Sequence, residues 1–161
     1  MKHYWTVTPE WYGETAYLLG CGPSLNRVDV NQLQGRRVIA INDSYLLAPW
    51  AEILYWCDNK WWLQHKERIA ETFRGRVIAT LENQIDGVRA LRNAGQLGLE
   101  TDPGAIRNGS NSGYQAINLA VHLGVKRIVL LGYDMQVNGD RLHWQPSTDM
   151  QTAQGFQRTL Q

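Results

Sequence analysis

The feature that most constrains the fold is a series of short apolar segments, each ended by glycine or by small polar side chains. Segments of about four to eight residues bounded in this way are typical of strands that are buried in a sheet. Five are predicted as strands: residues 15–20, 36–42, 51–58, 75–82 and 125–134. The last is almost wholly apolar, so we expect it in the centre of the sheet.

Helical periodicity lies between these strands. Residues 59–73 have apolar positions on one face and charges on the other, with Asp58 or Asn59 as the N-cap. Residues 110–124 form the strongest predicted helix, which Gly124 ends. Residues 83–95 are predicted as a short helix, and residues 96–109 as a loop.

Alternation of strands and helices predicts a parallel sheet covered on both faces. The expected architecture is a three-layer, Rossmann-like α/β fold with a mostly parallel sheet. We find no repeat or interdomain linker, so residues 1–161 are expected to form one domain.

Composition excludes several classes of protein. Hydrophobic residues make up 43% and charged residues 19% of 161 positions, which is typical of a globular protein. A formal net charge of +1 argues against a nucleic-acid partner. No apolar run approaches the roughly 20 residues of a membrane span, and the N-terminus lacks a secretory signal. A cytoplasmic location is therefore expected.

Cysteine, histidine and tryptophan give weaker signals. Cys21 and Cys57 are not spaced as a redox or zinc motif, and we expect reduced thiols. The four histidines show no metal-like pairing, so no metal site is predicted. Four of the seven tryptophans lie within residues 50–62. Packing is the favoured interpretation, and a stacking platform for a base or sugar ring is the alternative.

Polar groups gather where the predicted strands end. These segments are Gly20–Ser24, Asn42–Ser44, Asp58–Asn59 and Tyr133–Asp134. Ligands of open parallel sheets bind outside the carboxyl ends of the strands. This clustering therefore predicts a ligand site at that edge.

The turn Gly20-Cys21-Gly22-Pro23-Ser24 follows the first strand. Its glycines permit a sharp turn and leave backbone amides free for an anion, although Pro23 removes one donor. The spacing matches neither a dinucleotide-binding glycine motif nor a lysine-containing phosphate loop. A phosphate-binding turn and a plain strand-to-loop corner both remain open here.

Two further segments carry candidate chemistry. Small polar residues at 108–113 open the strongest helix, where free amides suit a phosphate; the alternative is ordinary capping by Ser110 or Ser112. His143 lies in the loop after Asp134 and is either a general base or a surface histidine. A single aspartate with Mg²⁺ also remains open.

These motifs stand in an order that resembles a known superfamily. It joins bacterial sialyltransferases that use CMP-sialic acid with 6-hydroxymethylpterin diphosphokinase-like proteins. The matching features are Gly20 to Leu25 after a strand, Asn42 at the end of the next, Ser112-Gly113 opening a helix, and Gly132-Tyr133-Asp134. The resemblance spans residues 15–150 and identifies the chain as a small, phage- or prophage-type member.

The resemblance implies a nucleotide or nucleotide-sugar partner at the carboxyl edge of the sheet. The Gly20–Ser24 turn and Asn42 would hold the phosphate and ribose, and Asn111, Ser112 and Gly113 the base or ribose. His143, followed by Thr148-Asp149, would be the general base. The full set implied for nucleotide binding is Gly20, Cys21, Gly22, Pro23, Ser24, Asn42, Asn111, Ser112, Gly113 and Asp134.

The chain departs from the sialyltransferase pattern at three places. Cys21 stands where those enzymes have asparagine. The connection between Asp134 and His143 is short and lacks tyrosine. Relatives continue through another helix and strand after this point, so we expect a fragment or a reduced member of the group.

Three functions follow from these features. The leading one is transfer of a sugar from a CMP-sugar. The second is Mg²⁺-dependent diphosphoryl transfer from ATP, with Asp58 and Asp134 as metal ligands. The third is a non-catalytic, phage-encoded binding protein with the tryptophan-rich residues 50–62 as its interface. Assembly into a homo-oligomer is left open.

Overall fold

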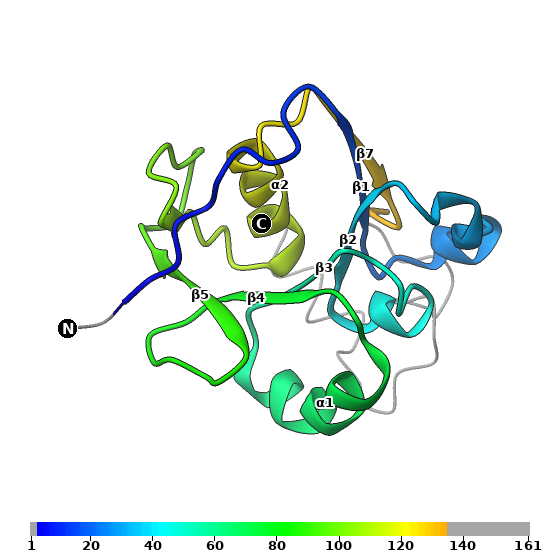
Figure 1. Ribbon diagram of the computed structural model, residues 1–161, viewed down its shortest axis with the longest axis horizontal. Helices are drawn as coiled ribbons and strands as arrows, with labels where there is room; N and C mark the ends of the chain where they lie inside the picture. The colour runs from blue at the N-terminus through cyan, green and yellow to red at the C-terminus, as the bar shows by residue number, and fades with distance from the viewer. Residues whose placement is uncertain (1–2, 135–161) are drawn as a thin grey trace.

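A single curled sheet of parallel strands organises the computed structural model, which describes residues 3–134 (Figure 1). The strand order is β6-β5-β4-β3-β2-β1-β7. The seven strands are β1 Thr15–Leu19, β2 Arg37–Ile41, β3 Ile53–Trp56, β4 Arg76–Thr80, β5 Val88–Asn93, β6 Ala105–Ile106 and β7 Arg127–Leu131. All strand pairs are parallel, and the predicted three-layer α/β fold is confirmed.

Two α-helices lie on opposite faces of this sheet. The sheet curls around α2 (Ser112–His122), and α1 (Asn59–Thr72) lies on its outer face (Figure 1). Asp58 caps α1 as predicted, because its side chain accepts from the Lys60 amide. Short 3₁₀ turns, η1 (Pro23–Arg27), η2 (Val30–Leu33) and η3 (Asn42–Leu46), follow β1 and β2.

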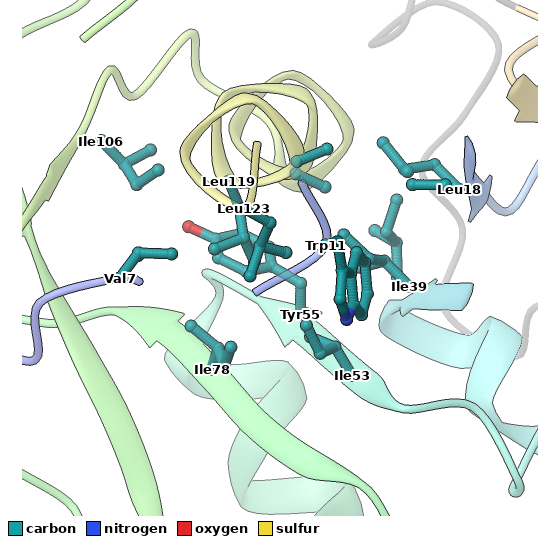
Figure 2. Packing of buried hydrophobic residues seen from close by; sticks show 14 of the residues in the cluster. Val7, Trp11, Leu18, Ile39, Ile53, Tyr55, Ile78, Ile106, Leu119 and Leu123 are labelled. Carbon is teal, nitrogen blue, oxygen red and sulfur yellow. The ribbon is translucent and has the colours of Figure 1, made fainter. Parts of the chain in front are cut away.

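Alternation along the strands places buried clusters on both faces of the sheet. Leu18, Ile39 and Tyr55 face α2 and the buried Trp11, as Figure 2 shows. Their neighbours Leu19 and Val38 face the 3₁₀ turns and α1. Because successive side chains of a strand point to opposite faces, each of these strands is apolar throughout.

The prediction of a helix over residues 83–95 is wrong. This segment contains β5, which pairs with β4 in the register Val77↔Val88. Ala90 and Leu91 are buried on opposite faces, whereas Arg89 and Arg92 are exposed. Val88 and Leu91 are three positions apart, a spacing that also fits one face of a helix. The segment forms a strand because it pairs with β4.

Two other expectations are corrected. Residues 96–109 are not wholly loop, because β6 pairs with β5 there. Within residues 3–134, β7 lies at the end of the strand order instead of the centre. Leu130 on this strand is 44% exposed, which is unusual for a central strand.

The strand order reverses between β1 and β7. The chain runs from β1 outward to β6, and α2 then carries it back to β7, on the other side of β1. Such a reversal is the place where open α/β sheets bind ligands. Among the described residues, no helix has the length and apolar character to span a membrane.

Candidate functional site

The Gly20–Ser24 turn is packed against the backbone that follows β7. The Gly20 amide donates to the Leu131 carbonyl at 2.8 Å, and the Gly22 amide donates to the Gly132 carbonyl at 2.7 Å. A Cβ at Gly20 would lie 2.5 Å from the Gly132 oxygen. The glycines therefore allow the ends of β1 and β7 to approach closely.

Asp134 binds the start of η1. Its Oδ2 accepts from the Ser24 amide at 2.8 Å, and its Oδ1 accepts from the Ser24 hydroxyl. The amides of Gly20, Gly22 and Ser24 are thus bonded within the chain, which favours the plain-corner alternative for these three amides over the anion-binding one. Asp134 places a carboxylate at the position where the sequence suggested a phosphate.

Asn42 and Ser112 meet at the carboxyl edge although 70 positions separate them. The Ser112 hydroxyl donates to Asn42 Oδ1 at 3.2 Å. Asn42 has a φ of +47°, a left-handed conformation that is uncommon outside glycine and that clusters at functional sites. The buried Ser44 hydroxyl accepts from the Ile41 amide and donates to the Leu19 carbonyl, which fixes this corner on β1.

Asn111 is the N-cap of α2, which corrects the prediction of Ser110 or Ser112. Its side chain accepts from the Tyr114 amide at 2.8 Å. Ser110 has a φ of +58° and lies before the helix. Ser112 is therefore the member of this segment whose hydroxyl faces the end of β2.

Tyr133 joins the two parts of the edge. Its ring lies 3.0 Å from the position that a Cβ would take at either Gly20 or Gly113, and its hydroxyl donates to the Gly113 carbonyl at 3.2 Å. Burial raises the pKa of this phenol, so it stays protonated. Tyr133 therefore packs between the Gly20–Ser24 turn and the start of α2, a contact that the sequence did not predict.

Cys21 lies between the glycines and is partly buried. Its thiol donates to the Ile41 carbonyl at 3.2 Å. Burial, and secondarily the charge of Asp43, raise the pKa of this thiol to about 12, although the Ser44 and Asp43 amides oppose the shift. The side chain is therefore a neutral packing group.

A second polar set, absent from the sequence predictions, lies beside Ser112. The Cys57 Sγ is 3.0 Å from the Ser112 hydroxyl. The Tyr55 hydroxyl donates to Gln115 Oε1 at 2.7 Å and lies 2.6 Å from the Thr80 hydroxyl. Burial raises the pKa of both Cys57 and Tyr55. The sequence feature that could have indicated this set is the location of Cys57 and Thr80 at the ends of predicted strands.

Cys57, Thr80 and Gln115 of this set line an open cavity of about 1030 Å³. It is lined by the ends of β3, β4 and β5 and by α1, including Cys57, Trp62, Thr80, Asn93 and Gln115. We call it the Trp62 cavity. Its volume is comparable to that of ligand sites, about 300–1,000 Å³.

The tryptophan cluster is mainly packing, as the sequence favoured. Trp56 is fully buried and stacks on Trp62, with ring centroids 4.8 Å apart. Trp61 donates to Asp43 Oδ1 at 2.6 Å and stacks on His65, whose Nδ1 lies 3.0 Å from the Tyr45 hydroxyl. Only Trp62, of the four tryptophans in residues 50–62, lines the Trp62 cavity.

The predicted base His143 lies outside the described residues, as do Thr148 and Asp149. Asp58 and Asp134, the ligands of the Mg²⁺ alternative, accept hydrogen bonds from Lys60 and Ser24 respectively. In the part of the chain that the structure describes, no three histidine, cysteine or acidic side chains gather as a metal site.

Comparison with known proteins identifies a fold but no family. No protein-family description matches the chain, and no curated protein does. Among solved structures, the fold is similar to the sialyltransferase CstII from Campylobacter jejuni, in complex with a substrate analogue, cytidine-5'-monophosphate. The TM-score is 0.51 at 15% identity, over 76% of this chain and 62% of that chain. The chain thus has a sialyltransferase-like fold and spans less than two thirds of that protein.

Proposed function

We propose that this chain binds a cytidine nucleotide at the carboxyl edge of its sheet and transfers a sugar from a CMP-sugar. The observation that carries the proposal is the meeting of Asn42 and Ser112 beside the reversal between β1 and β7. The sialyltransferase-like fold supports it, because the similar structure was solved with cytidine-5'-monophosphate.

In this proposal, Asp134 and Asn42 bind the ribose of the nucleotide. A carboxylate attracts hydroxyl hydrogens and repels phosphate, and its two oxygens offer about four acceptor positions. Ser24 uses two of them, which leaves acceptor capacity for a ribose hydroxyl. The phosphate then lies toward Asn42 and Ser112, away from the Asp134 charge.

His143 is proposed as the general base. A neutral imidazole would remove the proton of the acceptor hydroxyl as that oxygen bonds to the sugar carbon and the nucleotide phosphate departs. We expect His143→Ala to abolish transfer while leaving the affinity for CMP unchanged. Transfer at the unsubstituted rate, measured with a radiolabelled CMP-sugar, would contradict this role.

Binding is tested by calorimetry on the full chain with CMP, AMP and inorganic phosphate. We expect CMP to bind most tightly and Asn42→Gly to weaken it at least tenfold. Glycine retains the left-handed backbone, so the variant removes only the side chain. Ser110→Gly is the matched control, because Ser110 also has a positive φ but points its hydroxyl toward Gln96.

Two results would overturn the proposal. The first is no binding of CMP at millimolar concentration. The second is an equal loss of affinity in Asn42→Gly and Ser110→Gly, since that would separate nucleotide binding from the Asn42–Ser112 contact.

A further inference from the structure

We propose that the Trp62 cavity holds an uncharged sugar ring. That this ring is the transferred sugar rests on the function proposed above. That the cavity binds a sugar ring does not depend on that function. The cavity adjoins the proposed nucleotide site through Cys57, which lines the cavity and contacts the Ser112 hydroxyl. A group attached to a phosphate near Ser112 would therefore enter this space.

Trp62 supplies an apolar platform. Its ring is stacked on Trp56 at an interplanar angle of 4°, so the buried Trp56 covers one face. Trp62 lines the cavity, so a ligand there would contact the ring edge or the face turned away from Trp56. A flat indole suits the carbon–hydrogen face of a pyranose ring as well as it suits a base.

The polar lining favours a sugar over a base. It contains five carboxamides: Asn59, Asn83, Asn93, Asn108 and Gln115. Each carboxamide offers both donors and acceptors, which matches hydroxyl groups that act as both. Gln115 is saturated by Tyr55, Thr80 and Asn108 and forms a rigid wall, whereas the exposed Asn59 and Asn83 side chains have no hydrogen-bond partner among residues 3–134.

The charges favour a neutral sugar over a carboxylated one. Glu82 and Arg92 are the charged lining residues within the described part of the chain. Arg92 is paired with Asp102 at 2.7 Å, so its charge is already matched. Glu82 has no such partner there and would repel a carboxylate.

The test compares two ligands that differ by one charge, N-acetylneuraminic acid and its methyl ester, with N-acetylglucosamine as a smaller neutral probe. Binding to the full chain is measured by saturation-transfer NMR titration. We expect the ester to bind at least fivefold more tightly than the acid. Glu82→Gln should reduce the ratio of ester affinity to acid affinity. Asn83→Arg should bring this ratio close to one, because it adds a cation at an exposed position.

Variants of tryptophan locate the bound ring. Trp62→Ala should lower affinity for the neutral sugars at least tenfold. Trp50→Ala is the control, because Trp50 does not line the Trp62 cavity and its ring nitrogen donates to Asn31. Glu82→Gln and Asn83→Arg keep the inference testable even if Trp62→Ala fails to fold.

Equal affinity for acid and ester would overturn the inference, as would the absence of binding by both neutral probes. Competition of CMP with N-acetylglucosamine for one position would assign the cavity to the base and also overturn it. CMP is titrated separately by calorimetry. Nucleotide binding without sugar binding defeats this inference alone, and sugar binding without nucleotide binding defeats the proposed function alone.

Discussion

At the scale of single residues, the carboxyl edge depends on backbone positions with no room for a side chain. A Cβ on Gly22 would lie 2.5 Å from Asp134 Oδ2 and 2.6 Å from the Gly132 carbonyl. This close packing holds the end of β1 and the start of η1 against the segment that follows β7. Glycine is therefore required in this turn because a Cβ has no space there, more than because it leaves amides free.

Gly22→Ala is expected to destabilise the protein by about 1–3 kcal/mol, because the added methyl group overpacks fixed backbone atoms. Urea unfolding followed by circular dichroism measures the change. Gly104→Ala is the matched control, since its nearest neighbour would be 3.4 Å away. Equal effects of the two substitutions would contradict the close packing at Gly22.

The two partly buried thiols, Cys21 and Cys57, should react slowly in the folded protein because both resist ionisation. The pKa of Cys21 is raised to about 12 and that of Cys57 is also raised, so both stay protonated at pH 8. We expect iodoacetamide to label them slowly in buffer and rapidly in urea, as measured by mass spectrometry. Rapid labelling of Cys21 in the native protein would show that the thiol is exposed and ionised.

The same raised pKa predicts a loss of stability in alkali. The unfolded Cys21 thiol ionises near its ordinary value of 9.0, whereas the folded thiol retains its proton until about 12. Between these values the unfolded state binds fewer protons, so its free energy falls relative to the folded state. Unfolding titrations from pH 8 to 11 should show a steeper decline for the natural chain than for Cys21→Ala.

At the scale of elements, the start of α2 determines whether Ser112 faces Asn42. Asn111→Ala is expected to cost about 0.5–2 kcal/mol, because the Tyr114 amide loses its acceptor. Asn111→Asp retains an acceptor and should stay close to the natural stability. Thermal unfolding of both variants measures the difference, and an equal loss would argue against capping by Asn111.

Five strands and both helices could be predicted because doubly buried strands and amphipathic helices leave a local pattern. β5 could not be predicted, because the exposed Arg89 and Arg92 interrupt its apolar run and the spacing of its apolar residues also fits a helix. The strand-end rule predicted Asn42 at the carboxyl edge, but Ser112 opens a helix, and only the resemblance implied that both belong to one site. The Trp62 cavity was not, because Cys57 and Gln115 become neighbours only when α2 packs on the sheet.

At the scale of the whole molecule, α2 supports the sheet from within its curve. Leu119 and Leu123 are fully buried against β-strand residues (Figure 2). We expect Leu119→Ala to lower the free energy of unfolding by about 2–5 kcal/mol. Val121→Ala is the control, because Val121 is 41% exposed and should change stability by about 0.5 kcal/mol or less.

The contact between Ser24 and Asp134 also sets an order of events during synthesis. These residues are 110 positions apart, and the segments of β1 to β6 are complete at Ile106, before Asp134 is synthesised. Contacts of such sequence separation form slowly, since a long loop must close first. We therefore expect the proposed nucleotide edge to form late in folding, so that ligand affinity reports on the finished fold and not on its intermediates.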